Sequence, residues 1–370
     1  MDLYSTFKIK GGVTLKCLGN MERLHLPNDL VMQLFKLYEL KGQSYYYKAL
    51  FSRDDEVMAR TTLELDTQAL AYYLKLNLTP ARIKLLSDPR KDFVSKNRDE
   101  ILLKNIKEIL TRVQQLADTF DLTTNEIKDL ALTMFRGYDD IRLVRDPKAK
   151  VEKLAKSFDE LNSEDKLKKI IELFHQHRRN NKYEIVQIMT NFYIDFVKLN
   201  LFTDRNDLIG LMVIYTLAAK YFKVCRYDSF FQALLPLQAQ FDSGFIQASF
   251  NWSEGFSQIE PIQRIFVNVL ETLHRNVETK AHEYEFERKM NKTNSIEGTI
   301  LSGPATFSKK DIRVKHPYAS DATINRTLMS LKERGLIRPL GSGRTAQWLR
   351  VADKLEKFNP QQLDLFNHME

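Results

Sequence analysis

The chain has few of the residues that build disulfide frameworks or many-stranded sheets. Its 370 residues include only two cysteines, Cys17 and Cys225, and no Cys-x-x-Cys motif. Two cysteines cannot form a disulfide framework, so the sequence favours the reducing environment of the cytoplasm. Glycine and proline are also scarce, with 13 and 10 residues. Their scarcity disfavours a many-stranded β architecture, which needs such residues at its turns, and favours helices.

Long apolar runs and long blocks of one charge are also missing. The richest apolar run, residues 208–219, is interrupted by Gly210 and Thr216 and is too short to span a bilayer. The first residues do not join a basic stretch to an apolar one, so we expect no signal peptide. A hydrophobic fraction of 43% and a charged fraction of 28% are ordinary for a globular protein. These features predict a cytoplasmic protein with no membrane partner.

A surplus of basic residues is the one bulk property that bears on partners. The formal net charge is +8, which permits binding to nucleic acid and does not require it. A basic but otherwise ordinary surface explains the charge equally well, so a partner has to be identified from motifs.

The first 100 residues predict a mixed N-terminal region of helices and strands. Residues 7–16 alternate in polarity around a pair of glycines, a pattern typical of a β-hairpin. Residues 28–37 and 63–76 carry apolar side chains at helical spacing. We expect a boundary near residue 100, after the turn-rich segment 87–91.

From residue 101 the pattern is helical. Thr123 with Glu126 matches a capping box, which marks a helix start. One long helix is expected over residues 261–288, apolar early and charged late, as in a helix that leads to a separate module. The expected units are a mixed region over 1–100, a helical domain over 101–289, a further module over 290–352 and a tail over 353–370.

Residues 200–211 read Asn-Leu-Phe-Thr-Asp-Arg-Asn-Asp-Leu-Ile-Gly-Leu. This segment resembles the core motif of the Fic (Fido) family, His-Pro-Phe-x-Asp-Gly-Asn-Gly-Arg-x-Gly-Arg, and matches it at Phe202, Asp204, Asn206 and Gly210. An aromatic helix precedes the loop, and residues 250–262 are similar to the Trp-x-Glu-Gly…Thr-Pro-Phe segment of Fic proteins with a winged helix. The resemblance covers residues 100–350. It implies a mainly α fold, with a Fic-like helical core between the mixed N-terminal region and a C-terminal winged helix-turn-helix.

The Fic motif transfers AMP, and this chain differs from it at the reacting positions. In the family the His takes a proton from a target hydroxyl that attacks ATP, the glycines form a phosphate nest, and the arginines pair with the phosphates. Here Asn200 stands at the position of the His, Arg205 and Asp207 at those of glycines, and Leu208 and Leu211 at those of arginines. Asparagine cannot act as a general base, and losing such a base costs about 10²–10⁴-fold in rate. We therefore predict a catalytically degenerate protein, with no catalytic residue in the loop and no cofactor.

Two matching positions keep an enzyme open as the alternative. Asp204 stands where the family's acidic residue binds Mg²⁺, and Asn206 also matches. If both still serve a nucleotide, the chain is an AMP-transferring Fic enzyme with an altered active site, and its cofactors are ATP and Mg²⁺. Residues 293–298, Thr-Asn-Ser-Ile-Glu-Gly, also match the family's inhibitory pattern, but Leu211 replaces the arginine that this pattern blocks. We interpret that segment as the start of the next module's first helix.

Residues 306–351 carry the pattern of a winged helix-turn-helix. Ser308 precedes a short helix as its N-cap. A second helix runs from Ser320 to a C-terminal Gly335, with a buried apolar stripe at Ile324, Leu328 and Leu331. Two strands then flank the expected wing tip, Gly-Ser-Gly-Arg at 341–344. In such a module the second helix is the recognition helix.

We predict that this module binds DNA. The residues expected on or near its exposed surface are Ser320, Thr323, Asn325, Arg326 and Lys332 on the second helix and Arg344 on the wing. Asparagine suits adenine, arginine suits guanine or phosphate, and a wing arginine reaches the minor groove or the backbone. Basic residues between 309 and 316, Arg313 and His316 among them, are expected to add positive charge. Winged helices also bind proteins or form dimers, so a protein-binding scaffold and a homodimer remain as alternatives.

The histidines predict no metal site. His175 and His177 lie two apart on a helix, so they do not share a face. His274 and His282 fall on the long helix over residues 261–288 and are expected to face solvent.

Overall fold

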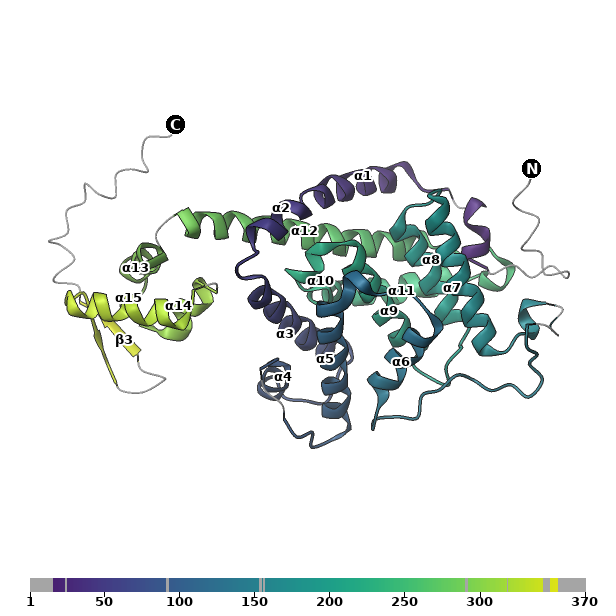
Figure 1. Cartoon of the computed structure of the whole chain (residues 1–370), viewed down its shortest axis with the longest axis horizontal. Coiled ribbons are helices and arrows are strands. Elements are labelled where there is room, and N and C mark those ends of the chain that lie inside the picture. Colours follow the sequence, from purple (N-terminus) through teal and green to yellow (C-terminus); the bar gives the residue numbers. More distant parts are fainter. Residues whose placement is uncertain are drawn as a thin grey trace. The chain divides into compact units, whose positions relative to one another are not determined.

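The computed structural model describes residues 16–23, 25–90, 93–152, 155, 157–289, 292–317, 319–341 and 347–351. The chain forms two compact units, residues 1–278 and residues 279–370. Helices dominate the described residues, and one small sheet belongs to the second unit (Figure 1). This arrangement confirms the predicted mainly α fold. No helix within the described ranges is both long and apolar enough to cross a membrane.

The first unit consists of helices joined by short connections. Its α-helices are α1 (Asn28–Gly42), α2 (Ser44–Leu50), α3 (Asp55–Tyr73), α4 (Pro80–Ser87), α5 (Arg98–Leu116), α6 (Thr124–Phe135), α7 (Ser163–Asn180), α8 (Ile185–Lys198), α9 (Asn206–Tyr221), α10 (Phe230–Leu234), α11 (Gln238–Ser249) and most of α12 (Glu260–Lys289). Its 3₁₀ helices are η2 (Leu18–Arg23), η3 (Ala117–Thr119), η4 (Phe158–Glu160), η5 (Lys223–Arg226), η6 (Leu235–Leu237) and η7 (Trp252–Glu254). The long helix predicted over residues 261–288 is confirmed as α12.

Two buried helices, α8 and α9, support the loop that carries the Fic-like motif. Residues 186–197 of α8 and 208–219 of α9 are buried throughout. The side chains of α9 in this range are nearly all apolar, whereas α8 also buries the polar side chains of Gln187, Asn191 and Asp195. A Cβ added at Gly210 would lie 3.0 Å from the Phe196 ring and 3.2 Å from the Tyr193 ring. The glycine therefore permits the close approach of α9 to α8.

A buried carboxylate ties α3 to α9 and α10. Asp66 is fully buried and accepts hydrogen bonds from Ser229 Oγ (2.6 Å), Phe231 N (2.9 Å) and Tyr215 Oη (3.1 Å). Burial raises the pKa of Asp66 to about 7, although its three hydrogen bonds act in the opposite direction. This network fixes the helices that surround the base of α9.

Every regular element in the described part of the N-terminal region is a helix. Between residues 25 and 90 lie α1 to α4, and the described part of residues 16–100 contains no strand. The hairpin predicted over residues 7–16 falls outside the described residues apart from Lys16, so it stays a prediction. Helix α3 packs against α5, so helices on both sides of residue 100 share one core.

The second unit combines three helices with a small sheet, in the element order expected for a winged helix-turn-helix. Its elements are α13 (Lys292–Ser302), β1 (Thr306–Ser308), α14 (Lys309–Lys315), α15 (Asp321–Glu333), β2 (Ile337–Pro339) and β3 (Gln347–Arg350), and the antiparallel sheet has the order β1-β3-β2. Ser308 caps α14, as predicted, and Ser320 caps α15. Gly335 follows α15 with a φ of 73°, a left-handed conformation that favours glycine. The predicted stripe is buried at Ile324, Leu328 and Leu331.

Two histidines differ from the prediction. His274 is buried within α12, not exposed to solvent, because it follows Leu270 by four residues and falls on the same apolar stripe. Burial, with the nearby charge of Lys41, lowers the pKa of His274 to about 4. His316 is also buried, and its Nε2 forms a hydrogen bond with Thr299 Oγ1 at 2.7 Å. It therefore belongs to the interior of the second unit and adds nothing to the charged surface.

Candidate functional site

The loop between α8 and α9 is held in a fixed turn by its own residues. Asn200 and Arg205 have left-handed backbone conformations, with φ of 46° and 56°. The buried Asn206 side chain accepts a hydrogen bond from Phe202 N and donates one to Phe202 O, both at 2.9 Å. These bonds give Asn206 a structural role that accounts for its match to the motif without a ligand.

Residues 141–144 run beside this loop. Val144 N donates to Leu201 O at 2.9 Å, and Leu143 forms an isolated antiparallel bridge with Phe202. The pairing braces the loop from a segment about 60 residues earlier in the chain.

A cavity of about 440 Å³ lies beside Phe202. Its lining includes the cations Lys128, Arg142 and Arg145 and the carboxylates Asp146 and Glu164. Lys128 Nζ lies 3.3 Å from Glu164 Oε1, so these two charges form a pair. Arg142 Nη1 likewise lies 3.6 Å from Asp140 Oδ2, so two of the three lining cations are paired with carboxylates and the net charge that the lining offers a phosphate is small.

The five positions that differ from the Fic motif lie in two environments. Asn200, Arg205 and Asp207 are exposed, whereas Leu208 and Leu211 have only 4% and 2% of their surface exposed. The two leucines therefore contribute to the core and offer no charge to a phosphate. Asn200 has no titratable nitrogen that would serve as a general base.

Carboxylates surround the first turn of α9. Asp204 and Asp207 are exposed, and Asp204 Oδ1 accepts a hydrogen bond from Arg205 N at 2.7 Å. Burial raises the pKa of the Tyr73 hydroxyl, and the negative charges of Asp242 and Asp207 raise it further. Asp207 and Asp242 therefore both lie close enough to Tyr73 to affect its ionisation. A helix N-terminus favours an anion, but Asp207 already supplies one in this turn.

This arrangement does not fit a nucleoside triphosphate with Mg²⁺. Binding a polyphosphate needs several cations, and Arg205 is the only one between residues 200 and 211. Within the described ranges, no group of three His, Cys, Asp or Glu residues is placed to hold a metal ion. Asp204 is the carboxylate at the family's Mg²⁺-binding position, and octahedral Mg²⁺ would need most of its ligands from elsewhere.

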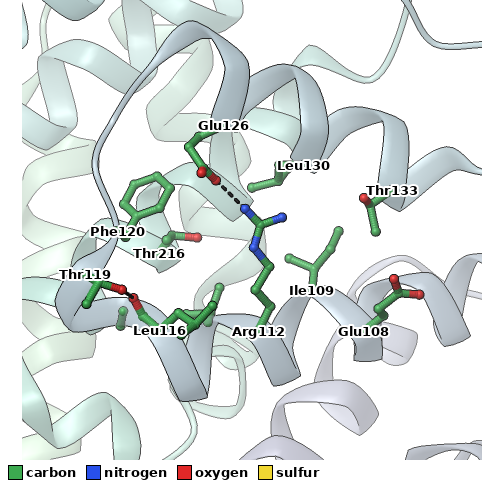
Figure 2. Close-up of a pocket in the computed structure, with 12 residues that line it drawn as sticks. Glu108, Ile109, Arg112, Leu116, Thr119, Phe120, Glu126, Leu130, Thr133 and Thr216 are labelled. Atoms are coloured by element: carbon green, nitrogen blue, oxygen red, sulfur yellow. Dashed lines mark hydrogen bonds and ion pairs between the residues drawn. The ribbon is translucent and has the colours of Figure 1, made fainter.

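A second pocket, shown in Figure 2, opens between α5, α6 and α9. Its volume is about 150 Å³, and apolar side chains such as Ile109 and Phe120 line it. The Arg112 side chain extends from α5 toward Glu126 (Figure 2). It forms ion pairs with Glu126 and with Asp129. Because two carboxylates already hold this guanidinium, the pocket offers mainly apolar walls to a ligand.

Helix α15 presents a basic and polar outer face. Asn325, Arg326 and Lys332 are exposed and lie outside the buried stripe. Ser320 Oγ accepts a hydrogen bond from Thr323 N at 3.1 Å, and the two hydroxyl groups lie 2.8 Å apart. Of the five predicted helix residues, three are therefore exposed outside the buried stripe and two form the N-terminal cap.

Two ion pairs of this module were not foreseen from the sequence. Arg313 on α14 pairs with Asp321 in the first turn of α15, so it positions that helix as well as adding charge. Arg334 Nη1 lies 2.5 Å from Glu297 Oε1. The glutamate of the inhibitory-like segment 293–298 is therefore ion-paired with a residue of the second unit itself. Each pair joins different helices, and helical periodicity carries no signal of such contacts. Arg344, predicted on the wing, lies outside the described residues.

Comparison with known proteins identifies the fold. No family model and no curated protein sequence matches the chain. The crystal structure of a Fic family protein from Desulfovibrio desulfuricans G20 is similar, with a TM-score of 0.52 and 13% sequence identity over 89% of this chain and 98% of that one. A Fic domain containing signaling protein from Bacteroides thetaiotaomicron VPI-5482 gives a TM-score of 0.48 and 13% identity over 68% of this chain and 98% of that one. The first comparison shows that this chain has the Fic fold, which confirms the fold expected from the motif.

Proposed function

We propose that the chain is a DNA-binding regulatory protein that acts through its winged helix, and that its Fic-fold unit does not transfer AMP. The observation that carries this proposal is the outer face of α15, where Asn325, Arg326 and Lys332 are exposed together. Side chains of these types bind adenine, guanine and phosphate in the major groove of DNA.

The distribution of charge supports a nucleic-acid partner. Residues 296–351 contain ten Lys and Arg against four Asp and Glu, so this short module carries +6 of the net charge of +8. A concentrated positive surface attracts the phosphate backbone and supplies affinity that does not depend on sequence. The exposed Lys309, Lys310 and Arg338 belong to the same module and would add phosphate contacts.

The chemistry of residues 200–211 supports the second half of the proposal. The base position is occupied by Asn200, and the phosphate-pairing positions by the buried Leu208 and Leu211. Asp207 adds a negative charge to the helix N-terminus that would receive a phosphate. Base, nest and cation clamp are therefore altered together, and restoring one of them would leave the others missing.

Fluorescence anisotropy of a labelled DNA duplex, titrated over a range of salt concentrations, tests the DNA proposal. We expect affinity to fall steeply with salt, with a log–log slope of about 0.9 per phosphate contact. Arg326→Ala and Lys332→Ala should each weaken binding, and Arg344→Ala tests the wing. Arg60→Ala, which removes an equal exposed charge from α3 of the first unit, is the matched control. Affinity that does not respond to salt, or an equal loss in Arg60→Ala, would overturn the proposal.

Asp204 supports a second candidate function, AMP transfer by an altered active site. Its exposed carboxylate is a possible Mg²⁺ ligand. Calorimetry with ATP and Mg²⁺, followed by incubation with ATP labelled in its α-phosphate, separates the two functions. The main proposal expects neither heat nor transfer of label. Transfer that disappears in Asp204→Asn would establish the enzyme instead.

A further inference from the structure

Two apolar side chains lie among the polar and basic residues on the exposed side of α15. Ile324, Leu328 and Leu331 belong to the core cluster of the second unit. Because a helix turns by about 100° per residue, positions 322 and 329 lie almost directly opposite this buried stripe. Ala322 and Met329 occupy these positions, and both are exposed. The outermost part of the helix surface is therefore apolar, although polar residues flank it.

Asn325 and Arg326 complete one contiguous patch with these two residues. Both are exposed, and each lies three or four positions from Ala322 and from Met329, which makes it a neighbour of both on the helix surface. Met329 is the largest apolar member, with 55% of its surface exposed. The patch thus combines a carboxamide and a guanidinium with two apolar groups.

Two carboxylates lie near the patch. Asp321 pairs with Arg313 of α14, so its charge is balanced within the module. Glu333 is exposed at the last position of α15, one turn beyond Met329. In a helix-turn-helix the N-terminal part of the recognition helix contacts the bases, so Glu333 lies at the end of the helix that is farther from them.

The composition of the patch suits base edges better than phosphate. Phosphate contacts come from charged and polar groups, so Ala322 and Met329 would add nothing to them. In the major groove each A·T pair presents the C5 methyl group of thymine, which apolar side chains contact, and adenine N6 and N7, which pair with asparagine. Ala322 and Met329 are seven residues apart, about 10 Å along the helix, which is close to the rise of about three base pairs.

We propose that α15 reads A·T base pairs through the methyl groups of thymine. Met329 and Ala322 contact the C5 methyl groups, and Asn325 pairs with adenine. The inference rests on the proposed DNA binding and adds to it a base preference and the residues that set this preference. Phosphate contacts alone carry no sequence information.

Fluorescence anisotropy of the full chain with three duplexes of equal length tests the proposal. The duplexes alternate adenine with thymine (A·T), adenine with uracil (A·U) or hypoxanthine with cytosine (I·C). Replacing thymine by uracil removes only the methyl group, and burial of one methyl group is worth about fourfold in affinity. With two such contacts, we expect A·T to bind about tenfold more tightly than A·U. I·C keeps the donors and acceptors of the A·T minor groove but lacks both the methyl and the adenine amino group, so it should bind more weakly still.

The outcomes separate this inference from the proposed function. Salt-dependent binding that is equal for A·T and A·U, or equal for A·T and I·C, would overturn the methyl readout and leave DNA binding in place. Absence of binding to any of the three duplexes would overturn both.

Variants then locate the readout. Met329→Ala should weaken binding to A·T about fourfold and leave binding to A·U unchanged. Met329→Leu keeps an apolar side chain of similar volume and should retain the preference. Asn325→Ala should weaken binding to both duplexes, since each retains adenine, and leave their ratio unchanged. Met32→Ala shortens a methionine of α1 that is 64% exposed, and it should change neither affinity. An equal loss for A·T and A·U in Met329→Ala would show that this residue does not read the methyl group, and the proposal would fail.

Discussion

Helices α9 and α15 each follow a loop, but they differ in how much of their surface is buried. In α9, Leu208 and Leu211 are buried, and the helix is surrounded by protein from residue 208 to residue 219. In α15 only one stripe is buried, and Arg326 and Lys332 remain at the surface. A helix N-terminus attracts anions in both places, but a binding site also needs cations that point away from the core. The comparison explains why the phosphate-binding role proposed here is assigned to the second unit, although the chain has the Fic fold.

Leu211→Arg should have the largest effect, because it restores the family's arginine at a buried position. An unpaired charge in the core costs about 3–5 kcal/mol, which corresponds to a fall in Tm of about 10 °C for a unit of this size. We also expect no gain in ATP binding, because Asn200 and Asp207 remain. Tryptophan fluorescence measures the effect in a Trp348→Phe background, where Trp252 reports on the first unit alone.

Two controls complete that test. Leu211→Met preserves volume and polarity and should cost less than about 1.5 kcal/mol. Met329→Arg adds the same charge to the outer face of α15, where the methionine is 55% exposed, and should change stability by less than about 0.5 kcal/mol. If Leu211→Arg were as stable as the wild type and bound ATP, the contrast between the two helices would fail.

The pH dependence of the free energy of unfolding should also distinguish the two units. The pKa of Asp66 is about 7 in the fold, above its ordinary value of about 3.9. Below about pH 4 the carboxyl group is protonated in both states, and its contribution to stability is complete. As pH rises toward 7 only the unfolded chain ionises, so the free energy of unfolding falls by about 1.4 kcal/mol per pH unit. Above pH 7 the folded state ionises too, and the fall ends.

Urea unfolding between about pH 4 and pH 8 measures this dependence. Asp66→Asn keeps the size of the side chain and removes the titration, so its stability should lose this slope. Asp311→Asn is the matched change in the second unit, where hydrogen bonds from Ser308 lower the pKa of the carboxyl. Stability curves that run parallel for the wild type and Asp66→Asn would contradict the assignment.

Asn206→Ala should have an intermediate effect. It removes both hydrogen bonds to Phe202 and leaves the Phe202 N–H, which is buried, without its partner. The expected cost is about 2–3 kcal/mol, measured by Trp252 fluorescence as above. Asp204→Ala alters an exposed residue of the same loop and should cost less than about 0.5 kcal/mol. Equal costs for the two variants would show that Asn206 does not hold the loop.

Local patterns in the sequence predicted the parts of the molecule that depend on neighbouring residues. The apolar stripe of α15, the Ser308 cap and the length of α12 follow from helical spacing and capping, which need no tertiary information. His274 was misjudged because its neighbours late in α12 are charged, although its position relative to Leu270 places it on the buried side. The helical periodicity predicted α12 correctly. The prediction that His274 faces solvent was wrong, because it relied on residue type and not on the position of His274 in the apolar stripe.

The candidate sites depended more strongly on contacts between distant residues. Asp66 accepts a hydrogen bond from Ser229, which lies 163 residues away in the sequence. Asp195 accepts one from the backbone N–H of Cys17, 178 residues away, so no local pattern relates the two members of either pair. The sequence identified Asn206 through the motif, but only the bonds to Phe202 reveal its structural role.

Ser320→Ala should have the smallest effect, and it separates two roles at the start of α15. Ser320 Oγ accepts from Thr323 N at 3.1 Å, and loss of such a cap costs about 1 kcal/mol. Ser320→Gly should recover all but a few tenths of that stability, because glycine is also tolerated at this position. If Ser320 affects DNA binding only by capping α15, Ser320→Gly should bind DNA like the wild type. Ser320→Asp should preserve the cap but repel the DNA phosphates. Unfolding followed by Trp348 fluorescence, together with anisotropy, measures both properties. Weak binding by Ser320→Gly at wild-type stability would instead establish a direct contact between the hydroxyl and DNA.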